Sequence, residues 1–177
     1  EGEQIEGVGI FSLLSNQGVI ERYYVGSRES VRLDDGHSDV GTHVLVGADI
    51  EGHRILTTHF TWTQKGMSTD AQKAHAESLF AELDTLEEFV LCGDFNAPRK
   101  GETAAMFIHR YTDNIPPQYE TSIDIDLHRA GKTHASDLQD KMVDYLFTTP
   151  TYKANDVKLQ FGVSDHAAII ATIEKTA

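Results

Sequence analysis

The distribution of apolar and polar residues along the chain predicts a mixture of strands and helices. Apolar residues alternate with polar ones over residues 18–25, as in a strand with one buried face. Two β-rich runs, residues 43–50 and 53–60, are separated only by Glu51-Gly52. This arrangement predicts a β-hairpin that turns on two residues.

Helical periodicity is clearest over residues 68–86. Thr69 and Gln72 have the spacing of a capping box, and Asp70 lies in the first turn, where the helix dipole favours an acidic side chain. Leucines recur at helical intervals and predict a face that packs on a sheet: Leu79, Leu83 and Leu86. A second, shorter helix is predicted for residues 102–111.

Five apolar runs along the chain predict further strands. They are residues 8–14, 89–92, 142–148, 157–161 and 167–173, the last of which is apolar on both faces. Residues 26–41 are polar and predict a surface loop, whereas residues 112–141 lack periodicity and predict a long functional or mobile segment. In a chain of 177 residues, this order of elements predicts one α/β domain in which helices cover a sandwich of sheets.

Charge and composition narrow the possible partners. The chain carries 28 acidic and 15 basic residues, for a net charge of −13, which argues against tight binding of long duplex DNA. No apolar stretch is long enough to span a bilayer. The single cysteine, Cys92, allows no intrachain disulfide and is compatible with a reducing compartment such as the cytoplasm. Its apolar surroundings predict a buried side chain rather than a nucleophile.

A carboxylate and an amide follow the predicted strand at residues 89–92. In the run Gly93-Asp94-Phe95-Asn96, the Asp and the Asn stand two residues apart and share one face of an extended backbone. Together they suit a phosphate group with a hard divalent cation. Taken alone, the run is equally typical of a strand that ends in a turn.

Three more strand ends carry polar groups that a purely structural role explains poorly. His59 lies at the end of the second hairpin strand, and Asp144 points away from the apolar residues on either side of it. A carboxylate in an apolar strand needs a partner, and a histidine N–H is well suited. Asp165 and His166 precede the last apolar run. By themselves, these two are typical of a turn cap and an exposed side chain.

Considered together, these groups match the needs of metal-assisted phosphoester hydrolysis. Cations and a protonated imidazole neutralise the phosphoryl oxygens as negative charge builds on them. A carboxylate can orient and deprotonate the attacking water, and an amide can donate to a phosphoryl oxygen without a charge of its own.

The same residues, in this order, resemble the endonuclease/exonuclease/phosphatase superfamily. This superfamily includes AP endonucleases, pancreatic-type deoxyribonucleases, neutral sphingomyelinases, inositol polyphosphate phosphatases and deadenylases. The resemblance extends over residues 7–166, and its most specific parts are residues 93–96 and 164–166. It implies a four-layer α/β/β/α sandwich with Mg²⁺ or Mn²⁺ at the strand ends. It also implies a phosphoester substrate, which could be a small molecule, a lipid headgroup or a nucleic acid.

The resemblance assigns three side chains to the substrate and the water. His59 would bind the scissile phosphate and help with protonation. Asp94 would orient the nucleophilic water or bind the metal, and Asn96 would contact a phosphoryl oxygen.

Three further side chains would complete the site. Asp165 would serve the metal. His166 would stabilise the transition state or act as a base, and Asp144 would orient it.

One part of the family pattern has no counterpart in these residues. A strand with a catalytic Asn, and a later strand that ends in a metal-binding Glu, would both precede residue 7. The acidic residues near the start, Glu1, Glu3 and Glu6, stand in the wrong sequence context to replace them. We expect either that a further N-terminal segment completes the fold, or that a partner polypeptide does, or that the metal site is incomplete.

Two other functions stay open at this point. A family member without catalytic activity, which binds a phosphorylated ligand or partner, is compatible with the missing Glu. A zinc hydrolase that uses some of the nine histidines fits less well, because no His-Glu-x-x-His helix and no cysteine pair is present. The sequence also contains neither a phosphate-cradling Gly-x-x-x-x-Gly-Lys loop nor a dinucleotide fingerprint.

Overall fold

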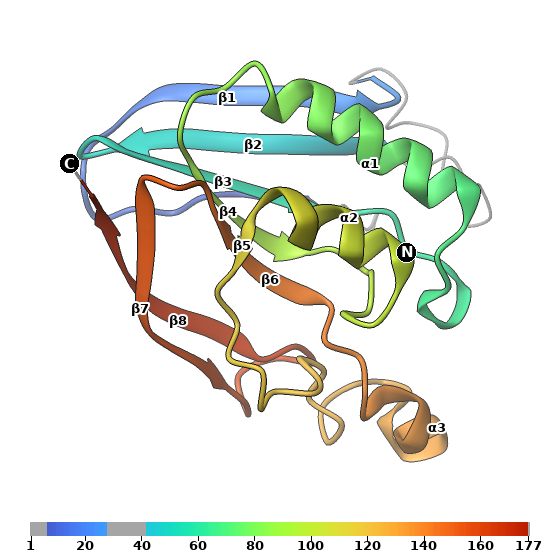
Figure 1. The fold of residues 1–177 in the computed structure, drawn as a ribbon. Coiled ribbons are helices and arrows are strands. Elements are labelled where there is room, and N and C mark those ends of the chain that lie inside the picture. The colour runs from blue at the N-terminus through green and yellow to red at the C-terminus, as the bar shows by residue number, and fades with distance from the viewer. Residues whose placement is uncertain (1–6, 28–41, 177) are drawn as a thin grey trace, which may run out of the picture.

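A six-stranded mixed sheet forms the central layer of the molecule (Figure 1). The computed structural model describes residues 7–27 and 42–176. The strands of this sheet are β1 (Asn16–Val25), β2 (His43–Ile50), β3 (His53–His59), β4 (Val90–Asp94), β5 (Thr112–Asp113) and β6 (Asp144–Thr148). Their order across the sheet is β1-β2-β3-β4-β6-β5, and all neighbours are antiparallel except β3 and β4, which run parallel.

Helices cover one face of this sheet, and a smaller sheet covers the other (Figure 1). The remaining elements are the 3-10 helix η2 (Gln64–Gly66), α1 (Asp70–Leu83), α2 (Glu102–Arg110), α3 (Gly131–Leu138), β7 (Tyr152–Gln160) and β8 (Ala168–Lys175). Strands β7 and β8 pair antiparallel as a separate two-stranded sheet. None of the helices in the described part of the chain is long and apolar enough to cross a membrane.

The two faces of the central sheet bury separate apolar cores. The first lies between the sheet and helices α1 and α2, and its largest members include Leu56, Phe60, Leu79, Phe80, Phe95, Phe107, Tyr145 and Phe147. The second lies between the two sheets and includes Val90, Met142, Leu146, Tyr152 and Leu159. Strand β6 serves both cores because its side chains alternate. Tyr145 and Phe147 face the helices, and Leu146 faces the smaller sheet.

The predicted hairpin and the start of α1 are confirmed. Glu51 and Gly52 have φ values of 47° and 82°, as a two-residue hairpin turn with positive φ at both positions requires. The Thr69 hydroxyl caps α1 by accepting from the Gln72 N–H at 3.1 Å. The Gln72 amide does not return to Thr69, however. It donates to the carbonyl oxygens of Thr61 and Asn96.

Several predicted boundaries were wrong. Residues 8–14 form no strand, and Phe11 and Leu13 are fully exposed. The segment 112–141 is not uniformly irregular, because it contains β5 and α3. The first long helix ends at Leu83, where the chain tightens into a turn closed by Leu86 N–H and the Leu83 carbonyl. Most of the predicted loop 26–41 lies outside the described residues.

The predicted α/β sandwich is confirmed. The described residues supply a helical layer and two sheets, and the outer face of β8 is exposed, with Ile170 on it. The inner face of β8 packs on the second core, and its outer face carries Ala168 and Ile170 before the polar Thr172. The prediction of a run that is apolar on both faces therefore holds only for the first half of the strand.

Gly93 allows the closest approach between two central strands. It pairs with Thr58 across the parallel β3–β4 ladder and has a φ of 146°. A Cβ atom at this position would overlap the Thr58 carbonyl oxygen. Only glycine fits here without moving backbone.

We expect the substitution Gly93→Ala to lower the free energy of unfolding by at least about 3 kcal/mol, because it combines an unfavourable φ with a backbone overlap. The matched control is Gly52→Ala, which also has a positive φ but open space around it; it should cost about 1 kcal/mol. Urea unfolding of both variants measures the difference. Equal costs would contradict this account of Gly93.

Candidate active site

Three polar side chains lie in a row across neighbouring strands. His59 of β3 is the register partner of Asp94 of β4, and Asp94 is the register partner of Asp144 of β6. Strands β3 and β4 are parallel, so both end at this edge of the sheet, and β6 starts there because it is antiparallel to β4. His59 Nε2 lies 3.6 Å from Asp94 Oδ2.

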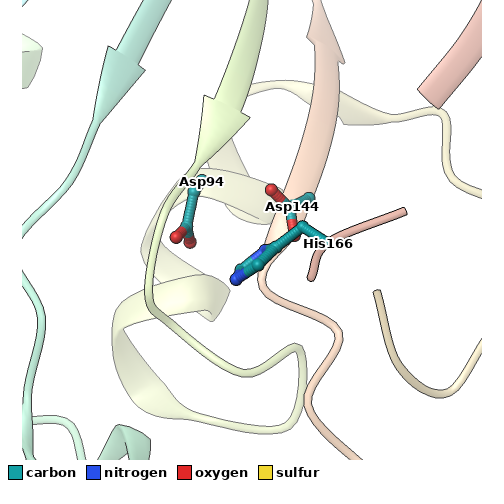
Figure 2. Close-up of side chains that lie close together, drawn as sticks. All are labelled: Asp94, Asp144 and His166. Atoms are coloured by element: carbon teal, nitrogen blue, oxygen red, sulfur yellow. The ribbon is translucent and has the colours of Figure 1, made fainter. Parts of the chain in front are cut away.

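His166 joins this row from the segment that enters the smaller sheet. Its Nδ1 lies 2.7 Å from Asp144 Oδ2, and its backbone forms a β-bridge with Ile123. Figure 2 shows the His166 ring between the two carboxylates, with its second nitrogen directed away from Asp144. Ligand atoms of Asp94, Asp144 and His166 all lie within 4.8 Å of one another. Within residues 7–27 and 42–176, no other three His, Cys, Asp or Glu side chains gather this closely.

The environment shifts the pKa values of this cluster strongly. Burial, and then the negative charge of Asp144, raise the pKa of Asp94 to about 6, although the Asn96 N–H and the nearby histidines oppose this. The hydrogen bond that His166 Nδ1 donates to the Asp144 carboxylate raises the pKa of His166 to about 9 against the opposing effect of burial. His166 is therefore an imidazolium at neutral pH, and Asp94 is a carboxylate whose charge is incompletely compensated.

Asn96 is fixed in a turn directly after β4. Its φ is 49°, a left-handed conformation that Asn tolerates well, and its backbone N–H donates to Asp94 Oδ1 at 2.8 Å. Its side-chain Nδ2 donates to the Phe60 carbonyl oxygen at 2.9 Å. One amide hydrogen of Asn96 is thus used to join the ends of β3 and β4, and the other is left for a ligand.

The structure does not bring Asp165 into the cluster. Its carboxylate is exposed and accepts a hydrogen bond from the Ser164 hydroxyl at 3.0 Å. Its backbone carbonyl accepts the Asp124 N–H at 2.9 Å. Adjacent residues of an extended chain point to opposite sides, which explains why His166 enters the cluster and Asp165 does not.

Ser122 is a residue whose importance sequence reasoning missed. It is fully buried, and its hydroxyl oxygen accepts the backbone N–H groups of Val143 and Asp144, both at 3.1 Å. Its carbonyl accepts the Ala167 N–H at 2.8 Å. Ser122 therefore holds the backbone beside both members of the Asp144–His166 pair. The run 121–126 alternates in polarity, and this signal could have identified it as an extended segment.

Asp124 continues this attachment on the same segment. Its side chain is buried and accepts the Gly162 N–H at 2.7 Å through Oδ2. Its Oδ1 accepts the backbone N–H groups of Asp126 and Leu127. The segment that contains Ser122 and Asp124 thus fixes the loop before β8, which carries His166.

Cys92 takes no part in the site. Its thiol lies on the side of β4 that faces the smaller sheet and donates to the Leu56 carbonyl oxygen at 3.5 Å. Burial raises the pKa of this thiol above its usual value, which makes it a poor nucleophile.

A cleft of about 750 Å³ lies at the opposite edge of the sheet, around the β2–β3 turn. Within its charged lining, Arg54 makes a bidentate ion pair with Asp49 and Lys175 donates to the Gly52 carbonyl oxygen, whereas Glu51 and Glu87 make no ion pair with any described residue. At the opposite ends of these strands, the carboxylates of Asp94 and Asp144 and the His166 imidazole converge within 4.8 Å of one another. We therefore place the candidate active site there.

The fold and the site together define an α/β sandwich protein with an Asp–Asp–His cluster at its strand ends. No protein-family model and no curated protein sequence matches the chain. Solved structures do match: the chain has the fold of endonuclease/exonuclease/phosphatase proteins, as the sequence resemblance predicts.

Three of these structures show the range of the fold. An endonuclease/exonuclease/phosphatase from Bacteroides vulgatus has 16% identity and a TM-score of 0.62, with 91% of this chain and 66% of that chain covered. A mannosyl-6-phosphatase from Bacteroides thetaiotaomicron has 10% identity and a TM-score of 0.61, with 90% and 67% covered. An AP endonuclease from Archaeoglobus fulgidus has 18% identity and a TM-score of 0.59, with 92% and 73% covered. The chain thus spans about two thirds of the length of the structures it matches.

The Asp144–His166 bond makes a prediction about pH. In the metal-free protein, an NMR titration should give His166 a pKa of about 9. In Asp144→Asn this pKa should fall steeply, because burial, which lowers it, is then opposed only by the smaller effects of the Asp94 and Asp165 charges. Asp165→Asn is the matched control and should lower the pKa far less, because it leaves the bond to Asp144 in place. An unchanged pKa in Asp144→Asn would contradict the assignment.

The same pKa has a consequence for stability. Because the folded pKa lies above the ordinary value of 6.5, the stabilisation is complete below pH 6.5 and is lost as the pH rises through about 9. The melting temperature of the metal-free wild type should therefore fall over this range, and that of Asp144→Asn should fall less.

Ser122 can be tested with a second buried hydroxyl as its control. Ser122→Ala should lower the free energy of unfolding by about 1–3 kcal/mol, because two backbone N–H groups lose their acceptor. Thr149→Ala removes an equivalent bond to the Phe89 N–H at the far end of β6 and should cost a similar amount. Only Ser122→Ala should shift the ring resonances of His166. Equal His166 spectra in the two variants would show that Ser122 does not position this site.

Proposed function

We propose that this chain carries the active site of a divalent-metal-dependent phosphoesterase that cleaves its substrate by attack of water. The observation that supports this most strongly is the register row of His59, Asp94 and Asp144, with His166 bound to Asp144 at 2.7 Å. Two acidic and two imidazole side chains meet at one edge of the sheet, where an anionic phosphoryl group can be bound and a water oriented.

The residues fit a hard divalent cation such as Mg²⁺ or Mn²⁺. Asp94 and Asp144 are crowded carboxylates, and the raised pKa of Asp94 reflects burial and uncompensated negative charge. Carboxylate oxygens are the ligands that such cations prefer. Asp94 would be the main ligand within the cluster. The carboxylate of Asp165 lies outside the cluster, so the metal role that we propose for Asp165 requires the loop at residues 164–166 to turn this side chain toward the site. When bound, the cation would polarise the phosphoryl oxygen and neutralise its charge.

The protein side chains would perform the remaining steps. His59 and the imidazolium of His166 bind the phosphoryl oxygens, and the free amide hydrogen of Asn96 donates to another. Asp94 orients the attacking water and takes its proton, and the water oxygen forms the new bond to phosphorus. The bond to the leaving oxygen breaks as His59 helps to protonate that oxygen. Asp144 keeps the His166 ring in place and in its charged form.

The first test is hydrolysis of bis-p-nitrophenyl phosphate with Mg²⁺ or Mn²⁺ by the full-length gene product that contains these residues. Asp94→Ala and His166→Ala should each lower kcat at least about 100-fold, because each removes a group that acts on the reacting phosphate or water. Asp70→Ala and His109→Ala are the matched controls, because both residues lie on exposed helix surface, and they should retain full activity.

Two outcomes would contradict the proposal. One is a folded wild type without metal-dependent hydrolysis. The other is activity that survives in both site variants. Binding of phosphate without hydrolysis would instead support a non-catalytic protein that recognises phosphorylated ligands.

A further inference from the structure

The loop between β3 and α1 presents the only tryptophan of the chain to solvent. Trp62 is 68% exposed, although Thr61 and Thr63 on either side are buried. Large aromatic side chains usually bury most of their surface, so an exposed Trp that is held by buried neighbours indicates a contact made in the functional complex.

Hydrogen bonds hold this loop in one conformation. The Thr61 hydroxyl bonds His75 Nδ1 at 2.8 Å, and the Thr63 hydroxyl donates to the Met67 carbonyl oxygen at 2.7 Å. Lys65 has a φ of 58°, and the Gly66 N–H donates back to the Thr63 carbonyl at 3.0 Å. The platform beneath Trp62 is therefore formed before any ligand arrives.

The same loop is fixed to the turn that follows Asp94. The buried Gln72 side chain donates from Nε2 to the carbonyl oxygens of both Thr61 and Asn96, at 2.9 and 3.3 Å. A Cβ added to Gly66 would lie 2.6 Å from Pro98 Cγ, so these two turns are in direct contact. Trp62 is also three residues beyond His59, roughly 10 Å along an extended chain. The backbone of this loop is therefore joined to the turn that carries Asn96, next to the candidate active site.

Positive charge gathers around the same turns in an otherwise acidic chain. Lys141 Nζ donates to the Lys65 carbonyl oxygen at 3.0 Å and also lies 3.9 Å from Asp140 Oδ1, and Lys100 follows the Pro98 turn. Lys65 and Lys100 are exposed, and among the described residues neither makes an ion pair with an acidic side chain. The overall charge is −13, so this local excess of cations is complementary to an anionic ligand.

We propose that the loop of residues 61–67 is a base-binding subsite, in which Trp62 stacks on a nucleobase whose phosphoester lies at the Asp94–His166 cluster. The proposal rests on the proposed function and names its substrate class as nucleotidyl phosphoesters. An aromatic face beside a few cations is the combination that binds unpaired nucleotides. Three lysines and a large negative net charge suit a mononucleotide or a short single-stranded end rather than a long duplex.

Because Trp62 is the only tryptophan, its fluorescence reports on the subsite directly. In the metal-free wild type, adenosine 5′-monophosphate should quench this fluorescence saturably. Ribose 5-phosphate and mannose 6-phosphate should bind at least about tenfold more weakly, because neither has a base to stack. His109→Ala, on the exposed surface of α2 and outside this loop, is the control and should respond as the wild type does.

Kinetics supply a second, independent measurement. Thymidine 5′-p-nitrophenyl phosphate and methyl p-nitrophenyl phosphate share a leaving group and differ only in the presence of a nucleoside. Trp62→Leu should lower kcat/KM about tenfold for the thymidine ester and leave the methyl ester within twofold. Trp62→Phe keeps an aromatic face and should restore most of the loss. Equal melting temperatures show that the exposed substitution leaves the fold intact.

The outcomes separate this proposal from the function on which it rests. Equal quenching by the sugar phosphates would overturn a base site in favour of a sugar site. No quenching by any of the three ligands, or equal losses of kcat/KM on both esters, would overturn the proposal altogether. If neither ester is hydrolysed, the proposed function fails, and the fluorescence titration still decides whether Trp62 binds a base.

Discussion

The arrangement of the site depends on one constraint, the directions of strands β3, β4 and β6. Because β3 and β4 are parallel, both bring their last residues to the same edge, and the antiparallel β6 begins there. His59, Asp94 and Asp144 consequently occupy one row of the ladder, with side chains held by backbone pairing and not by a flexible loop. A slip of one residue in any of these strands would turn its polar group to the opposite face.

The chain that enters the smaller sheet contributes the fourth side chain of the site, His166. His166 reaches Asp144 from the start of β8, and the chain around it is fixed by Ser122 and Asp124. The Asp144–His166 bond therefore connects the central sheet to the segment that enters the smaller sheet, next to the second apolar core. This explains how a partly buried carboxylate can be tolerated in β6, because the His166 imidazolium bonded to it is held in place by the chain that enters the smaller sheet.

Much of this could be predicted from local patterns. The alternation in β6 placed Asp144 opposite its apolar neighbours, and the two-residue turn gave the hairpin of β2 and β3. Other features depend on contacts between distant residues, which periodicity does not reveal. Thr112–Asp113 is a strand only because it pairs with β6. The apolar side chains of Phe11 and Leu13 are exposed because they pack on no sheet among the described residues.

The candidate site also combines features that local sequence indicates with features that depend on distant contacts. The residue types at the strand ends indicated phosphoester chemistry, and the family resemblance supplied the pairing of Asp144 with His166. Side-chain alternation along an extended backbone separates Asp165 from its neighbour His166, but which of the two faces the cluster depends on the direction in which the strand enters. Alternation could identify the extended segment around Ser122 but not the role of its hydroxyl, because the two N–H groups that it accepts, those of Val143 and Asp144, lie 21 and 22 residues further along the chain.

In the proposed function, Asp94 and His166 together hold a metal-bound phosphoryl group at the ends of β3 and β4. A crystal soaked with Mn²⁺ and phosphate tests it most directly, because Mn²⁺ is located by its anomalous scattering. The account predicts an anomalous peak within coordination distance of an Asp94 carboxylate oxygen and a phosphate oxygen in hydrogen-bond contact with His166. Mn²⁺ bound elsewhere, or phosphate bound without contact to either residue, would contradict it.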